Sequence, residues 1–132
     1  MPLHHTISHS KRLVVALAKG ACSRADIERY FTEVSSEGGG PYGKIFDVTQ
    51  AEFTLSREDV QVLAGRIGEI ARLGLPMGPV AIVASNDESR ALARLFARNA
   101  PAERPISIFS EHHEARKWIE SRSGEASRSI AP

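Results

Sequence analysis

Two strand–helix units follow one another directly between residues 78 and 118, and this succession constrains the fold more than any other feature. Residues 79–84, PVAIVA, are a short apolar run rich in β-branched side chains, which predicts a buried strand. Residues 86–99 change to helical spacing, and residues 105–109 alternate as another strand before a last helix. Successive units of this kind favour parallel strands joined by right-handed crossovers, so the stretch predicts an α/β fold.

More strands are expected before this region. Residues 13–18 are apolar and end at a turn at Gly20, and residues 44–48 form a further short run. Residues 3–9 alternate weakly and predict an edge strand. The stretch 49–54 has the composition of a loop.

Serines precede the four helices that we expect. Ser23 and Ser56 are each followed three residues later by an aspartate, and Ser85 is followed in the same way by Glu88, which is the pattern of a capping box. Ser110 is the expected cap of the last helix. The sequence thus predicts one α/β domain over residues 1–120, with a mixed, mostly parallel sheet of four or five strands and about four helices. The small, polar residues 121–132 predict a disordered tail.

Composition narrows the class of protein. Lys and Arg total 17 and Asp and Glu total 16, and the resulting net charge of +1 gives no general electrostatic case for a nucleic-acid partner. No apolar run approaches the ~20 residues of a membrane span. The single cysteine, Cys22, fits a reducing compartment, and its place before a helix favours a buried structural thiol. We therefore expect a cytoplasmic protein with no nucleic-acid partner and no membrane span.

Several motifs suggest chemistry but lack the context that it needs. A GxGxxG pattern at Gly38, Gly40 and Gly43 lies between a helix and a strand, the reverse of the order in a dinucleotide site. Asp47 at a strand end is similar to the phosphoacceptor of receiver domains, but Lys19 stands in the segment where those domains need an acidic pair. Capping a loop is the alternative role for Asp47. Adjacent histidines in the last helix point about 100° apart, so they cannot both chelate one metal ion. We assign no catalytic residue, no cofactor and no metal site.

The carboxyl ends of parallel strands gather at one edge of a sheet, and ligands of open α/β sheets tend to bind there. Helix N-termini face the same edge and suit an anion, although helix capping alone would also explain the serines. The candidate ligand- or partner-binding residues of this loop edge are Asp47, Thr49, Ser56, Ser85, Asn86, Asp87, Arg94 and His112.

The order of four phrases along the chain resembles the SpoIIAA-like branch of the STAS superfamily. The phrases are KIFDV, LSREDVQVLAGR, GPVAIVASNDESRALARLF and ISIFSEHHEARKWI, and the match covers about residues 10 to 120. The resemblance implies a compact α/β domain with a mixed sheet of four or five strands. It also implies a family whose members mostly lack an assigned activity.

The anti-sigma-factor antagonists of that superfamily carry a serine in a D-S-x-G segment at a helix start, which a partner kinase phosphorylates. That segment is absent here, because VTQAEFTLSRED follows Asp47. Ser56 is the nearest positional counterpart, although its expected role as a helix cap explains it, and Glu58 and Asp59 would repel a phosphate. Arg94 matches the helix arginine of the family, with no role to carry over.

We therefore expect a non-enzymatic, regulatory module that binds a protein partner. The alternative is a carrier of an anionic or apolar small molecule, bound between sheet and helix or at the loop edge. An enzyme is a third hypothesis, for which the spacing offers no nucleophile–base pair. A homodimer could use the small residues of the helix after Ser56, although core packing explains them as well; they are Ala64, Gly65, Gly68 and Ala71.

Overall fold

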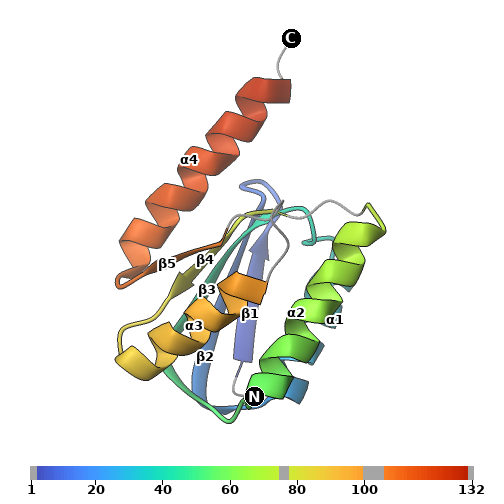
Figure 1. Cartoon of the computed structure of the whole chain (residues 1–132). Coiled ribbons are helices and arrows are strands. Elements are labelled where there is room, and N and C mark those ends of the chain that lie inside the picture. Colours follow the sequence, from blue (N-terminus) through green and yellow to red (C-terminus); the bar gives the residue numbers. More distant parts are fainter. Residues whose placement is uncertain (1–2, 75–77, 100–105, 131–132) are drawn as a thin grey trace.

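The computed structural model describes residues 3–74, 78–99 and 106–130 (Figure 1). Within them, a sheet of order β1-β2-β3-β4-β5 pairs β1 antiparallel to β2 and the other neighbours parallel. This confirms the predicted fold class, a mixed and mostly parallel sheet with four helices. The elements are β1 (Leu3–Ser8), β2 (Leu13–Cys22), α1 (Arg24–Ser36), β3 (Gly43–Phe53), α2 (Arg57–Arg72), β4 (Val80–Val83), α3 (Asp87–Asn99), β5 (Ile106–Phe109) and α4 (His112–Ile130).

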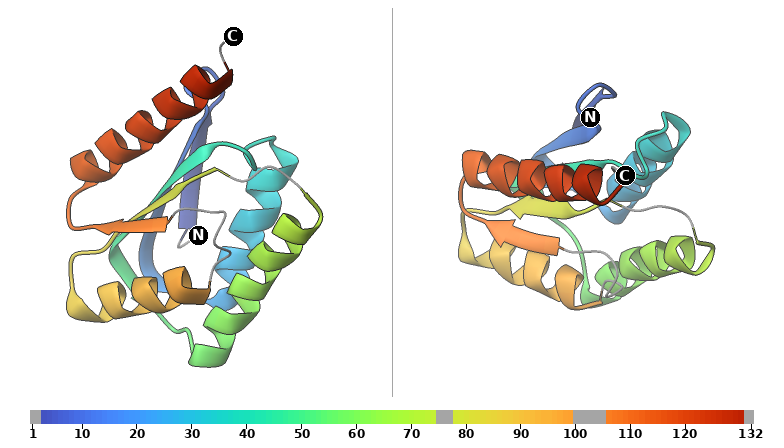
Figure 2. Two further views of the ribbon diagram at one scale, coloured as in Figure 1. Left: turned by 45° about the horizontal axis from the view of Figure 1, so that its top comes forward. Right: turned by 90° about the horizontal axis from the view of Figure 1, so that it is seen from above.

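Helices cover the two faces of the sheet unequally. Each parallel connection steps to the next strand in the same direction, so right-handed crossovers place α1, α2 and α3 on one face. α4 lies on the opposite face, as the view from above in Figure 2 shows. Alternation along the strands divides the core accordingly. Val14 and Ile82 face the three helices, whereas Ile45 and Val83 pack in a second cluster with Ile119 of α4.

β2 and β3 are longer than the sequence predicts. The turn expected at Gly20 and the loop expected over 49–54 are wrong, because β2 continues to Cys22 and β3 to Phe53, with Cys22 paired to Phe53. The extension has exposed polar residues on one face, so it lacks the continuous apolar run that marks a strand buried on both faces. Gly20 adopts φ +69° within β2.

Local capping fixes where the helices begin. α1 and α2 have the predicted capping boxes, in which the hydroxyls of Ser23 and Ser56 accept from the backbone N–H groups three residues on. The predicted cap of α3 is wrong: Asn86, rather than Ser85, accepts from the backbone N–H of Ser89 through its side-chain oxygen at 2.7 Å. An amide side chain bonds an N3 N–H as readily as a hydroxyl does. Ser110 lies one residue too early to cap α4 and its hydroxyl accepts from Arg90 instead.

α4 continues to Ile130, through most of the segment that we expected to be a disordered tail. Ala115 and Ile119 anchor the first half of the helix in the core. Once a helix is nucleated, each further residue adds a hydrogen bond, so a polar continuation needs no apolar face of its own. The domain boundary at residue 120 stays a prediction. No helix among the described residues is both long enough and apolar enough to cross a membrane.

The capping carboxylates predict a dependence of stability on pH. The backbone N–H of Ser23 holds the pKa of Asp26 below its ordinary 3.8, and the backbone N–H of Ser56 lowers the pKa of Asp59 in the same way. A carboxyl whose pKa is lower in the folded chain stabilises that chain above its unfolded pKa, and this contribution is lost as the pH falls through the folded pKa. We expect the double variant Asp26→Ala/Asp59→Ala to be less stable than the wild type at about pH 6 and the gap to narrow below about pH 4. Urea unfolding at several pH values measures the gap, and a constant gap would contradict the prediction.

Candidate functional site

A cavity of about 310 Å³ lies between the sheet and the three helices α1, α2 and α3, and it is partly open to solvent. Its wall is mostly apolar, with aromatic and aliphatic side chains from β3 and from each helix. Protein cores rarely contain a void larger than a water molecule, so a space of this size calls for an explanation. Representative lining residues are Phe31, Phe46, Val48, Leu63, Ile67 and Phe96.

Short side chains on α3 contribute to the space. Ser89 and Ala93 are both buried and both line the cavity, so the part of α3 that faces the sheet there carries little side-chain volume. On the strand side, Phe46 and Val48 alternate onto the cavity face of β3. Ser89 and Ala93 therefore leave space on the α3 wall, which Leu92 and Phe96 of the same helix also line.

The cavity opens at the end of α1 and the connection to β3. Ser35, Gly38 and Pro41 are exposed and also line the cavity, which places an opening to solvent beside them. This end holds the amino termini of the parallel strands, the edge opposite to the one that the sequence analysis favoured. Gly38 has φ +82°, a left-handed conformation that favours glycine.

The α1–β3 connection is held in place by β1 and by the turn that follows it. His5 Nε2 lies 2.6 Å from Glu37 Oε2, and His9 Nδ1 lies 2.7 Å from Tyr42 Oη. Gly39 is buried here, and a Cβ at this position would lie 2.9 Å from Val34 Cγ1. The glycine-rich segment between α1 and β3 therefore forms a packed rim of the cavity.

Among the described residues that line the cavity, Lys44 is the one that carries a charge. It is only 7% exposed, and its Nζ donates to the carbonyl oxygens of Gly40 at 2.7 Å and Tyr42 at 2.8 Å. Because side chains alternate along a strand, Lys44 faces the same side of β3 as Phe46 and Val48. The cavity thus has an ammonium group near its opening and an apolar interior.

Two of the predicted loop-edge residues lie inside β3 and interact with each other. Asp47 Oδ1 accepts from the backbone N–H of Thr49 at 3.0 Å and from its hydroxyl at 2.7 Å. The register of β3 against β2 shifts here, between the pairs Leu17–Asp47 and Lys19–Gln50. Asp47 and Thr49 therefore support a β-bulge, which is close to the capping role that we considered for Asp47.

The other predicted residues surround the N-termini of three helices. Ser56 and Asn86 are caps, Ser85 and Asp87 are exposed, and His112 is half-buried as the first residue of α4. Arg90 joins the β4–α3 and β5–α4 connections, since its Nη1 donates to the Ala84 carbonyl oxygen at 3.2 Å and to Ser110 Oγ at 2.7 Å.

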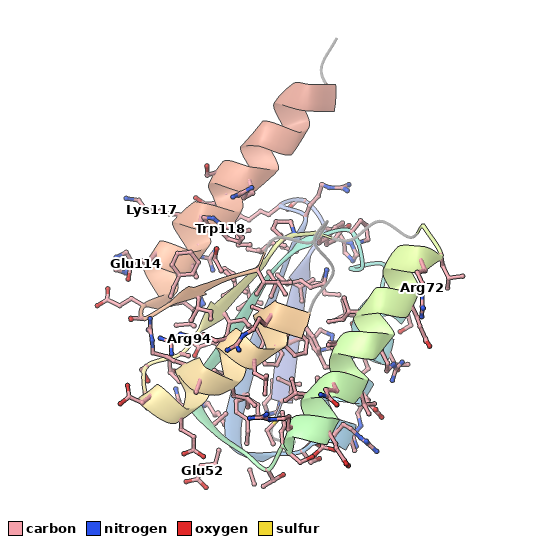
Figure 3. All side chains as sticks on the ribbon, viewed as in Figure 1. Glu52, Arg72, Arg94, Glu114, Lys117 and Trp118 are labelled. Carbon is pink, nitrogen blue, oxygen red and sulfur yellow. The ribbon has the colours of Figure 1, made fainter. Side chains whose placement is uncertain are left out.

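Arg94 is exposed on α3 and is labelled in Figure 3. None of the eight predicted site residues is among those that line the cavity. The binding role of the loop edge stays a prediction.

Cys22 is a buried thiol, in agreement with the sequence analysis. Burial, and after it the charge of Asp26, raises the pKa of the Cys22 thiol to about 11. Since the thiolate is the nucleophilic form, this cysteine is unsuited to nucleophilic catalysis near neutral pH.

Comparison with known proteins identifies the fold. The sequence matches no protein-family model and no curated protein. Among solved structures, an uncharacterised DUF3478-family protein with a SpoIIAA-like fold from Shewanella loihica PV-4 is similar, with a TM-score of 0.62 and 18% identity over 89% of this chain and 93% of that one. This chain has the SpoIIAA-like fold. The anti-sigma factor antagonist SpoIIAA in its unphosphorylated form matches as well, with a TM-score of 0.57 and 13% identity over 89% of this chain and 96% of that one.

These likenesses confirm the fold that the four sequence phrases imply. At such low sequence identity, the two structures support the SpoIIAA-like fold alone. Any function therefore has to be argued from the residues of this chain.

Proposed function

We propose that this SpoIIAA-like domain is a non-enzymatic module of the cytoplasm that binds an apolar small molecule in the cavity beneath α1, α2 and α3. The observation that carries the proposal is the cavity itself, which at about 310 Å³ lies at the lower end of the range for small-molecule sites. Its mostly apolar wall with few polar groups is typical of such sites. Binding there would stabilise the folded chain by mass action.

The carrier that we considered from sequence had its ligand between sheet and helix or at the loop edge. The cavity supports the first of these places, with its opening at the amino ends of the strands. A ligand that changes how α2 and α3 pack would also change the surface that these helices expose, and this is how such a module could regulate.

A protein-binding surface at the loop edge is the second candidate. The observation that favours it is the fold shared with SpoIIAA, an anti-sigma factor antagonist. The connections that Arg90 joins and the α2 cap at Ser56 would form this surface. A homodimer through the small residues of α2 remains a further proposal. Of these residues, Gly65 is exposed and could take part in such an interface, whereas Ala64 is buried in the core.

Native mass spectrometry of the protein purified from its own organism tests the proposed function, with added decanol as a simple apolar probe. We expect either a retained small molecule or, once the protein is stripped of ligand, binding of one decanol per chain with a rise in the melting temperature. Absence of both a retained molecule and decanol binding would overturn the proposal.

A further inference from the structure

We propose that the ligand of this cavity is an aromatic compound with a neutral hydrogen-bonding group, such as a hydroxyl, that bonds to Ser89. This rests on the proposed function and adds to it the chemical class and the orientation of the ligand. Two independent features of the cavity wall support it, the aromatic side chains that line the cavity and the hydroxyl of Ser89.

Aromatic side chains line the cavity from both helices and sheet. Four phenylalanines pack against the core, yet each is only half-buried and each lines the cavity; they are Phe31, Phe46, Phe53 and Phe96. The buried ring of Tyr30 lines it as well. A ligand in the cavity would therefore cover aromatic surface that the fold itself leaves incompletely buried.

Three of these rings already pack together as aromatic pairs prefer to. Tyr30 meets Phe46 edge to face, with ring centroids 5.3 Å apart and planes at 69°, and its centroid lies 5.9 Å from that of Phe31. Such pairs gain free energy beyond that of the area they bury, because the positive edge of one ring meets the negative face of another. An aromatic ligand would extend this cluster, whereas a saturated skeleton of the same size would bury only area.

Ser89 provides a hydrogen-bonding group on the α3 wall. It is 6% exposed, lines the cavity and shares the inner face of α3 with Ala93 and Phe96. Its backbone N–H donates to the side chain of Asn86, but its hydroxyl makes no hydrogen bond to a residue that the structure describes. Buried polar side chains are nearly always hydrogen-bonded, because an unpaired one is costly. A hydroxyl or carbonyl group of the ligand would provide the partner.

The two ends of the cavity set the orientation of the ligand. Ser89 lies in the first turn of α3, which begins beside the carboxyl end of β4. The opening, at Ser35, Gly38 and Pro41, lies at the amino ends of the strands. The hydrogen-bonding group of the ligand therefore lies at the inner end, with its rings against Phe46.

The test is calorimetric titration near neutral pH with 2-naphthol, which is un-ionised there because phenols ionise near pH ~10. Two further probes each lack one of its features: decahydro-2-naphthol keeps the hydroxyl without the aromatic rings, and naphthalene keeps the rings without the hydroxyl. For the wild type we expect 2-naphthol to bind about 2- to 10-fold more tightly than decahydro-2-naphthol, the range that one ring–ring contact provides.

Ser89→Ala tests the hydrogen bond. We expect this variant to bind 2-naphthol about 2- to 10-fold more weakly than the wild type and to bind naphthalene equally well, because one hydrogen bond is lost. Ser36→Ala is the matched control: Ser36 is an exposed helix residue that is not among those lining the cavity, so both affinities should stay the same.

The outcomes separate this inference from the proposed function. Equal affinity of the wild type for 2-naphthol and decahydro-2-naphthol would overturn the aromatic ligand. If Ser89→Ala left 2-naphthol binding unchanged, or weakened 2-naphthol and naphthalene by the same factor, the hydrogen bond and with it the inference would be overturned. Binding of decanol but not of 2-naphthol would overturn the inference and leave the apolar carrier standing. Binding of none of the probes, decanol included, would overturn both proposals.

Discussion

Replacing Gly78 with alanine is expected to destabilise the protein by about 3 kcal/mol or more, at or above the upper end of the usual cost of overpacking. A Cβ at this buried position would lie 2.1 Å from the carbonyl oxygen and 2.4 Å from the carbonyl carbon of Tyr42. Both are backbone atoms, so no change of a side-chain rotamer can relieve the clash. The backbone just before β3 or just before β4 would have to move, next to the hydrogen bond in which Lys44 N–H donates to the Pro79 carbonyl oxygen at 2.9 Å.

The matched control is Gly65→Ala in α2. Gly65 is exposed and a Cβ there meets no atom within 4 Å. Alanine in a helix interior is more favourable than glycine by about 1 kcal/mol, so this substitution should stabilise the protein. Urea unfolding of the two variants measures both changes. If Gly78→Ala were as stable as the wild type, the close approach of Gly78 to Tyr42 would be wrong.

Sequence reasoning succeeded where local chemistry decides the structure. The continuous apolar run over 79–84 favours a buried strand, and β4 lies there with helices on both faces. The capping boxes at Ser23 and Ser56 involve residues three apart, so the sequence alone specifies them. The prediction of Ser85 as the cap of α3 was wrong, because the adjacent Asn86 is also of a residue type that caps helices.

Contacts between distant residues explain what sequence reasoning missed. His5 and Glu37 are 32 residues apart and His9 and Tyr42 are 33 apart, so nothing local pairs them. The cavity depends on where the small side chains of α3 meet β3, which is a property of packing. One sign of the cavity was present in the sequence. Lys44, Phe46 and Val48 alternate in a predicted strand, so their side chains face the same side of it, and a lysine on the inner face of a strand is unusual.

Ala93→Leu is expected to stabilise the ligand-free protein by up to about 2 kcal/mol and to weaken decanol binding about tenfold or more. Ala93 is 6% exposed and lines the cavity, so the carbon atoms that leucine adds can enter existing space. Each buried methylene contributes about 0.8 kcal/mol, and the same groups take the place of part of the ligand chain. Urea unfolding without ligand and calorimetric titration with decanol measure the two effects.

Ala81→Leu is the matched control, because Ala81 is 0% exposed and lies on the other face of the sheet, in the cluster with Ile45 and Ile119. It is not among the residues that line the cavity, so the same substitution overpacks the core and should cost about 1–3 kcal/mol. The two substitutions would change the free energy of unfolding in opposite directions only if there is unfilled space beneath α3. If Ala93→Leu destabilised the protein as much as Ala81→Leu does, the interior beside α3 would be filled in solution and would have no room for a ligand.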